Sequence, residues 1–216
     1  MTTNPRPPAG RRLAILGGSG ATGRHLIDEA LRAGHDVTAL VRNPASLEGV
    51  GPGVRVVVGE LTDPAVTAET VNGATAVISA LGSREGRRAT TVYSDAVRSV
   101  LAAGVHRVVA VSAVPAAPDA SKTLVERRLV HPLLHLFFGG SYADMRRMEA
   151  LLAGSDALWT VLRPPRLTNG AARGTYRQST ERLPRPSSIS RADLAAALVL
   201  AVDREDFVRK AVTISY

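Results

Sequence analysis

Continuous apolar runs rich in valine, isoleucine and leucine alternate with amphipathic stretches along most of the chain. A strand that is apolar along its whole length is typical of a parallel sheet buried on both faces. These runs predict strands at residues 13–17, 36–42, 54–60, 74–82, 106–114, 157–164 and 208–216. The stretches between them predict helices at residues 21–34, 64–73, 90–104, around 121–138, 141–153 and 190–203.

Residues at the predicted helix ends support these boundaries. Gly34 and Gly104 follow two of the helices, and glycine is the residue that most readily ends a helix. Ser190 and Asp193 have the spacing of a helix N-cap and its third residue, close to a capping box.

Strands that alternate with helices predict an α/β fold with a doubly wound parallel sheet, a Rossmann fold. Residues 1–10 contain three prolines and one glycine and predict a disordered tail. Residues 11–216 then form a single domain that includes the substrate pocket. Its polar segment 165–189 is expected to be irregular and to belong to a small C-terminal part that covers the substrate.

The composition narrows the class of protein. The chain has 216 residues, of which 45% are hydrophobic and 21% charged, so it has enough apolar side chains for a core. It has no cysteine, which excludes disulfides, thiol catalysis and zinc–thiolate sites. The first residues lack an apolar segment typical of an export signal, and the stretch 129–138 is too short to span a bilayer. We therefore expect a cytoplasmic protein with no membrane partner.

The formal net charge of +8 does not by itself indicate a nucleic-acid partner. Lys122 and Lys210 are the only lysines, and the other 25 of the 27 basic residues are arginines. They are scattered in ones and twos, without a basic block interleaved with aromatic residues. We expect no nucleic-acid partner, and an anionic ligand is the better use of a few arginines.

A glycine-rich segment between the first predicted strand and the first predicted helix is the most informative motif. Gly17, Gly20 and Gly23 are spaced three apart. In this setting the first glycine allows a tight turn, the second lets a pyrophosphate approach the backbone, and the third lets helix and strand pack closely. Free N–H groups at the helix start, together with the helix dipole, would bind the phosphates.

Arg42 lies at the end of the second predicted strand, 19 residues after Gly23. A site that prefers NAD usually has an acidic residue there to bind the ribose hydroxyls. A guanidinium instead suits a 2′-phosphate, and Asp36 lies at the other end of the strand. The sequence therefore predicts NADP(H) as the cofactor.

These segments together resemble a known family. GGSGATG, VRNP after the second strand, VVGELTDP after the third and VLRPPRL after the sixth are similar to the atypical short-chain dehydrogenases/reductases of the NmrA-like, NAD(P)-binding group. The segments at 80–113 and 146–167 are most similar to the flavin reductase/biliverdin-IXβ reductase type. The resemblance covers about residues 12 to 216.

The resemblance implies a set of site residues. Residues 19 to 23 (Ser19, Gly20, Ala21, Thr22 and Gly23) would bind the pyrophosphate and Arg42 the 2′-phosphate. The other implied contacts are with the adenine (Glu60 and Leu61, although the family more often has Asp at position 60), the cofactor after the fourth strand (Leu81, Gly82 and Arg84), the nicotinamide (Ser112, Pro164 and Pro165) and the substrate (Arg166).

The acid–base pair of most short-chain dehydrogenases, Tyr-x-x-x-Lys, is absent, because Pro118 and Asp206 stand four residues before the two lysines. In that pair the lysine lowers the pKa of the tyrosine, which then donates a proton. The nearest similar spacing is Tyr142 with Arg146, so Tyr142 and Ser112 are the candidate catalytic residues. A missing acid favours acceptors whose reduced product is a delocalised anion, because such acceptors need orientation more than a tuned proton donor. The flavin/biliverdin reductase type also lacks the pair.

His131 and His135 have the spacing of two side chains on one helical face. A metal site needs a third ligand, and the sequence has no acidic or histidine partner at a suitable distance. We expect no metal, and the apolar run around these residues is more plausible as a substrate lid or subunit contact.

The leading hypothesis is an NADPH-dependent reductase that transfers hydride to a conjugated or aromatic small molecule: a flavin, quinone, enone or tetrapyrrole-like acceptor. One alternative keeps the fold and the nucleotide for isomerisation, cyclisation or epimerisation. Another is a non-enzymatic regulator that senses NADP(H). The expected oligomeric state is a monomer or a homodimer.

Overall fold

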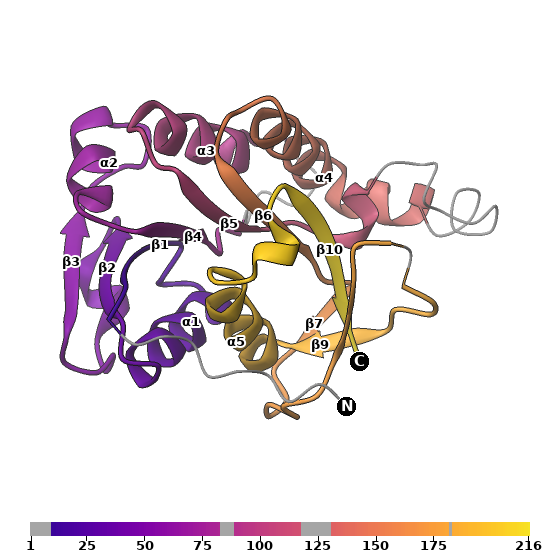
Figure 1. The fold of residues 1–216 in the computed structure, drawn as a ribbon. Helices are drawn as coiled ribbons and strands as arrows, with labels where there is room; N and C mark the ends of the chain where they lie inside the picture. The colour runs from indigo at the N-terminus through magenta and orange to yellow at the C-terminus, as the bar shows by residue number, and fades with distance from the viewer. Residues whose placement is uncertain (1–9, 83–88, 118–130, 182) are drawn as a thin grey trace.

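The computed structural model describes residues 10–82, 89–117, 131–181 and 183–216, without the side chains of residues 131–138. Within these ranges eight strands form one sheet in the order β3-β2-β1-β4-β5-β6-β10-β8 (Figure 1). Seven of these strands run parallel and confirm the predicted strands: β1 (Arg12–Leu16), β2 (Asp36–Val41), β3 (Val54–Val58), β4 (Ala76–Ser79), β5 (Arg107–Val111), β6 (Leu158–Arg163) and β10 (Lys210–Ser215).

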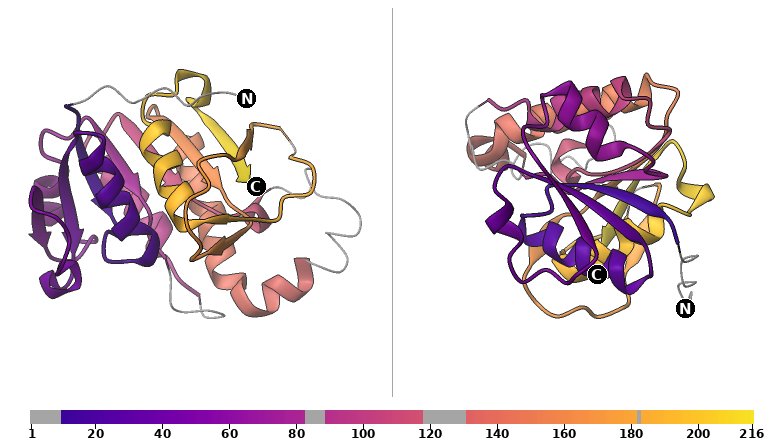
Figure 2. Two further views of the ribbon diagram at one scale, coloured as in Figure 1. Left: turned by 90° about the horizontal axis from the view of Figure 1, so that it is seen from below. Right: turned by 90° about the vertical axis from the view of Figure 1, so that its left-hand side faces the viewer.

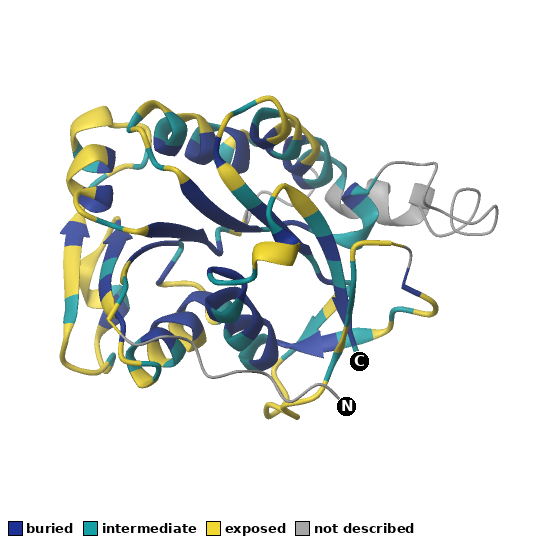
Figure 3. Cartoon of the chain, viewed as in Figure 1, coloured by how far each residue is buried: buried dark blue, intermediate teal, exposed yellow. Residues whose placement is uncertain are grey.

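Helices cover both faces of the sheet, which confirms the doubly wound fold (Figures 1 and 2). One face carries α1 (Ala21–Arg32) and α5 (Arg191–Ala201), and the other carries α2 (Pro64–Val71), α3 (Val92–Ala102) and α4 (His131–Ala153). Successive side chains of β1 enter the two cores in turn: Leu13 packs on the α1 side and Ala14 on the α3 side. The central strands β1, β4 and β5 are therefore buried along most of their length, which explains their continuous apolar runs, whereas the edge strand β3 is mostly exposed (Figure 3).

The sequence predicted that the segment 165–189 is irregular, and the structure corrects this prediction in part. It contributes β7 (Arg166–Thr168), β8 (Arg177–Ser179) and the first residues of β9 (Ser188–Ser190). β8 pairs antiparallel with β10 at the sheet edge, and β7 pairs with β9 in a separate two-stranded sheet. Strands of three residues are too short to show a hydrophobic period, which is why the sequence pattern did not reveal them.

The two predicted helices at 121–138 and 141–153 are also corrected. In the described part of this region a single helix, α4, runs from His131 to Ala153 through Gly139 and Gly140; residues 118–130 lie outside the described residues. Each glycine costs a helix about 1 kcal/mol relative to alanine, which predicted a break there. Packing of α4 on α3 outweighs this local cost, because buried residues such as Met148 and Leu152 belong to the shared core.

The predicted cap at Ser190 is confirmed, but its second half differs from a capping box. The Asp193 amide donates to Ser190 Oγ at 3.0 Å, whereas the Ser190 amide donates to the hydroxyl of Tyr216 at 3.1 Å. The Asp193 carboxylate instead accepts from the amides of Arg173 and Gly174, at 2.8 and 2.9 Å. Burial alone would raise the pKa of Asp193, but these hydrogen bonds outweigh burial and lower it. An ionised Asp193 thus ties the segment after β7 to α5.

Charged side chains are buried at the amino-terminal edge of the sheet. Arg107 donates to the carbonyl oxygens of Val202 at 3.0 Å and Leu158 at 2.7 Å, and burial lowers its pKa to about 10. His35 is 4% exposed, and its Nδ1 has no hydrogen-bond partner within the described residues. Burial lowers the pKa of His35; the Asp203 carboxylate opposes this effect and the Arg11 guanidinium adds to it.

The lowered pKa of His35 predicts a loss of stability in mild acid. Because the folded protein favours neutral His35, the unfolded chain takes up the proton first as the pH falls below 6.5. The free energy of unfolding should therefore decrease from about pH 7 to about pH 5, and decrease less in His35→Leu. Urea unfolding across this range measures both slopes. His106→Gln, which replaces an exposed histidine, is the control. If the free energy of unfolding of His35→Leu fell with pH as steeply as that of the parent, the assignment of this pH dependence to His35 would be contradicted.

Candidate functional site

The carboxyl ends of the parallel strands form the candidate site. From β1 the chain passes to β2 on one side, and β4 lies on the other side of β1, so the strand order reverses between β1 and β4. In open α/β sheets, ligands bind in the crevice at such a switch point. The glycine-rich segment lies there, directly after β1.

The turn from β1 into α1 leaves backbone donors available for a ligand. Gly20 is the N-cap of α1 with extended backbone angles, and its amide donates to the Gly17 oxygen at 3.0 Å. No side chain caps α1, and no acidic residue lies in its first turn. The first N–H groups of the helix, at Ala21, Thr22 and Gly23, are therefore available to an anion.

The three glycines differ in the space around them. A Cβ atom on Gly17 would lie 2.8 Å from the carbonyl carbon of Ala80, and one on Gly23 would lie 2.0 Å from the Gly17 oxygen. A Cβ on Gly20 would meet only the Gly17 oxygen, at 3.2 Å. Gly17 and Gly23 thus permit close backbone packing, while Gly20 borders open space. These are the three roles of a dinucleotide-binding turn, so the residues fit a pyrophosphate.

The other predicted nucleotide contacts follow the ends of neighbouring strands. Arg42 comes directly after β2 and is exposed, and Asp36 lies at the opposite end of that strand. Arg84 lies outside the described residues. The remaining predicted contacts are at the same edge of the sheet: exposed Ser19 and Glu60, half-buried Leu61 and Leu81, exposed Gly82, buried Pro164 and half-buried Pro165.

Ser112 and Pro164 are held side by side where β5 and β6 end. The Ser112 amide donates to the Leu162 oxygen at 2.9 Å, and the Val114 amide donates to the Pro164 oxygen at 3.0 Å. Ser112 is 2% exposed, and its hydroxyl has no hydrogen-bond partner among the residues that the structure describes. A buried hydroxyl without a partner costs about 1–3 kcal/mol and is uncommon outside functional sites. Arg166 follows in β7 and is exposed.

Tyr142 lies half-buried in α4, in an environment opposite to that of a tuned acid. Burial raises the pKa of its phenol, and the nearby Tyr93 raises it further. In a Tyr-x-x-x-Lys site the lysine lowers this pKa. Arg146, one helical turn later, is exposed. The structure therefore places Tyr142 against the α3–α4 core, where burial makes its phenol a weaker acid.

Two carboxylates that sequence reasoning missed hold α4 in place. Glu149 binds both Nε and Nη2 of Arg163, the last residue of β6, with an Nε–Oε1 distance of 3.0 Å. Asp144 is fully buried and accepts from the amides of Tyr93 at 2.9 Å and Ser94 at 3.3 Å, at the start of α3. Neither pair has a sequence signal, because the partners come from separate elements and no fixed spacing relates them.

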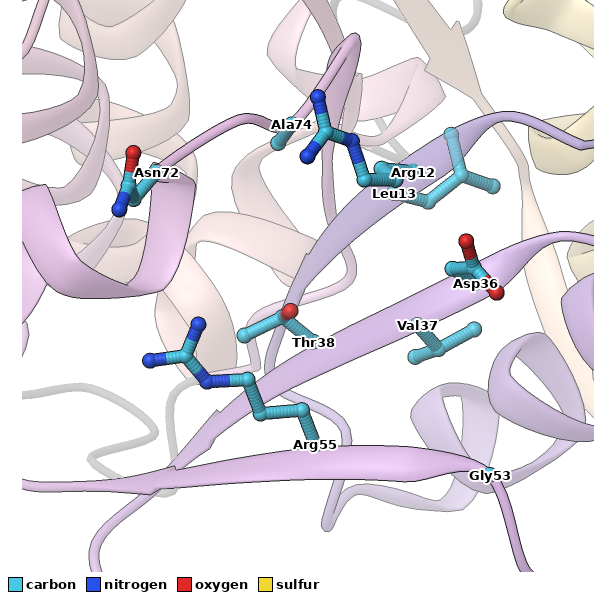
Figure 4. Close-up of a pocket in the computed structure, with 9 residues that line it drawn as sticks. All are labelled: Arg12, Leu13, Asp36, Val37, Thr38, Gly53, Arg55, Asn72 and Ala74. Atoms are coloured by element: carbon cyan, nitrogen blue, oxygen red, sulfur yellow. The ribbon is translucent and has the colours of Figure 1, made fainter.

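A hollow of about 230 Å³ lies at the opposite, amino-terminal edge of the sheet (Figure 4). Figure 4 shows the side chains of Arg12, Asp36 and Arg55 around it. Gly53, in the turn before β3, lines it, but the glycine-rich turn and the uncapped start of α1 lie at the other edge.

Two further findings concern metals and membranes. Within the described residues, no group of three or more histidine, aspartate or glutamate side chains is placed to hold a metal ion. The side chains of His131 and His135 lie outside that part. In the described ranges, no helix is both long and apolar enough to cross a membrane.

Comparison with known proteins relates this architecture to a nucleotide-binding group. A family model described as NAD(P)H-binding matches residues 17–205. The isoflavone reductase homolog IRL of Zea mays is 35% identical over 83 residues, which cover 34% of this chain and only 27% of that relative. The oxidoreductase aflX of Aspergillus parasiticus is 25% identical over 91% of this chain and 79% of its own length. ChuY, described as an anaerobillin reductase from Escherichia coli O157:H7, shares the fold: its TM-score is 0.76 at 22% identity, covering 94% of this chain and 96% of that one.

The different surroundings of Gly20 and Gly23 predict that substitution of the first reduces nucleotide binding and substitution of the second reduces stability. Gly20→Val should fold normally and lose NAD(P)H binding, because its side chain would occupy the space proposed for the pyrophosphate. Gly23→Ala should be destabilised by about 1–3 kcal/mol through overpacking against the Gly17 oxygen. Thermal unfolding and calorimetric titration with the nucleotide measure the two effects. Undiminished affinity in a folded Gly20→Val protein would place the nucleotide elsewhere.

Proposed function

We propose that the chain, which belongs to the NAD(P)H-binding family, is an NADPH-dependent reductase of the short-chain dehydrogenase type. Its acceptor is a conjugated or aromatic small molecule: a flavin, quinone, enone or tetrapyrrole-like compound. The observation that carries this choice of acceptor is the raised pKa of Tyr142, the residue whose spacing to Arg146 is nearest to the missing acid–base pair. Similarity to an oxidoreductase over 91% of the chain supports a redox reaction.

The proposed cofactor site extends along the carboxyl edge of the sheet. Residues 19 to 23 bind the pyrophosphate with backbone N–H groups, and Arg42 binds the 2′-phosphate through a charge-assisted contact. The nicotinamide lies beside Ser112 and Pro164, which backbone hydrogen bonds already hold together. The remaining proposed contacts are with the adenine (Glu60 and Leu61), the sugar and phosphates after β4 (Leu81, Gly82 and Arg84), the nicotinamide amide (Pro165) and the substrate (Arg166).

Bound NADPH supplies a hydride, and the protein orients the acceptor and balances charge. Reduction of a conjugated acceptor places the new negative charge on a delocalised system, so no tuned acid is required in the limiting step. The Ser112 hydroxyl is buried and free to hydrogen-bond an acceptor atom or to pass a proton from water. Tyr142, whose pKa is raised, is a weaker acid than the tyrosine of a Tyr-x-x-x-Lys pair.

Two other functions would use the same proposed nucleotide-binding residues. An isomerase, cyclase or epimerase would convert its substrate without net consumption of NADPH, and a sensor would bind the nucleotide without turnover. A screen of NADPH oxidation against flavins, quinones and enones separates the three, because only a reductase oxidises NADPH stoichiometrically with the acceptor. Binding of NADPH without oxidation by any acceptor in the screen would count against the proposal.

Arg42 is expected to set the choice of cofactor. Loss of a charge-assisted contact in Arg42→Ala should cost about 1.5–3 kcal/mol, or about tenfold to a hundredfold in NADPH affinity. NADH has no 2′-phosphate, so its affinity should barely change. Calorimetric titration of both nucleotides checks this expectation. Equal weakening of both would show that the arginine has a structural role.

Tyr142→Phe is expected to keep kcat within about tenfold of the parent on the best acceptor. The physical reason is that the raised pKa of Tyr142 makes it a poor proton donor, whereas removal of a true general acid costs about 10²–10⁴-fold. Steady-state kinetics provide the measurement. A loss of about three orders of magnitude in kcat, with KM and thermal stability unchanged, would make Tyr142 the acid and restore carbonyl substrates to first place.

A further inference from the structure

Arg24 connects the phosphate-binding turn to the loop that follows β2. It lies in the first turn of α1, where its amide donates to the Gly20 oxygen at 3.0 Å. Its guanidinium reaches across to that loop and donates from Nη1 to the Glu48 oxygen at 3.2 Å and from Nη2 to the Ser46 oxygen. One side chain thus joins the start of α1 to the segment that begins with Arg42.

The loop itself is an ordered unit. Asn43 caps the short 3-10 helix Pro44–Leu47, with Oδ1 accepting from the Ala45 amide at 3.0 Å. The Ser46 hydroxyl donates back to the Asn43 oxygen at 2.5 Å, and Leu47 is buried in the core under α1. These contacts fix the loop internally. Within the described residues, the side chain of Arg24 supplies two hydrogen bonds between α1 and the loop.

The direction of these bonds matters for an anion nearby. Two loop carbonyl oxygens, which carry partial negative charge, are occupied by a cation and so do not repel a phosphate bound by Arg42. A planar guanidinium spans both carbonyls at once, whereas a single ammonium would bind them less rigidly.

We propose that Arg24 is a specificity-determining positioning residue, which holds the loop of residues 42–48 so that Arg42 faces the 2′-phosphate of NADPH. This inference rests on the proposed cofactor site and adds to it a residue outside the glycine motif. Arg24 acts through Arg42, so its effect depends on the 2′-phosphate and on the presence of Arg42.

The test compares Arg24→Ala with a matched control on the same helix. Arg32→Ala removes an exposed arginine that pairs with Glu29 in the last turn of α1, far along the helix from the turn. In Arg24→Ala, calorimetry should show NADPH binding weakened about tenfold and NADH binding changed less than about twofold. Arg32→Ala should leave both affinities at the parent value, and thermal unfolding verifies that each variant is folded.

A double-mutant cycle with Arg42 distinguishes positioning from an independent contact. In the Arg42→Ala background, Arg24→Ala should weaken NADPH binding less than about twofold further, because the group that it positions is gone. Additive losses would overturn the inference, and so would equal weakening of NADPH and NADH by Arg24→Ala alone.

The outcomes also separate this inference from the proposed function. A parent protein that prefers NADPH, with an unchanged NADPH-to-NADH preference in Arg24→Ala, overturns the role of Arg24 and leaves the cofactor assignment intact. A parent protein without preference for NADPH overturns both.

Discussion

Backbone-to-backbone packing in the turn between β1 and α1 is the constraint on which the rest of the site depends. At Gly23 the first turn of α1 contacts the Gly17 carbonyl so closely that a methyl group would lie 2.0 Å from its oxygen. This contact directs the start of α1 toward the carboxyl end of β1 and leaves its first N–H groups uncapped. The pyrophosphate site, the position of Arg24 and the packing of α1 on the sheet all follow from it.

The two edges of the sheet handle charge in different ways. At the amino-terminal edge, the buried Arg107 donates to carbonyl oxygens at the end of α5 and at the start of β6, which stabilises the fold, although the Nδ1 of His35 there has no partner among the described residues. At the carboxyl edge, donors and cations remain exposed or unpartnered, among them Arg42, Arg166 and the hydroxyl of Ser112. An edge with unsatisfied donors favours an anionic ligand, because the ligand supplies the acceptors that the protein lacks.

Tyr142 shows how packing decides chemistry at a position that sequence spacing leaves open. Asp144 and Glu149 hold the C-terminal half of α4 against α3 and β6, so the phenol is partly buried against the core of α3 and α4 beside Tyr93. Burial raises its pKa, and Tyr93 raises it further. A weaker acid at this position favours acceptors that need no strong proton donor.

The sequence by itself determined the order and type of most elements, because buried parallel strands carry continuous apolar runs and their helices carry clear end signals. It also determined the glycine-rich turn proposed to bind the phosphates, since Gly17, Gly20 and Gly23 stand in a strand–turn–helix context with a fixed spacing. Such features are local: each depends on residues only a few positions apart.

Only the tertiary structure decided what depends on residues distant in the chain. The continuity of α4 through Gly139 and Gly140, the short strands β7 to β9 and the hydrogen bonds of Asp193 arise from packing between separate elements. The same holds for the contacts of Arg24 with the loop after β2, 22 and 24 positions further along the chain. Local propensity could not predict them, because in each case the free energy of tertiary packing or of a long-range hydrogen bond outweighs a small local preference.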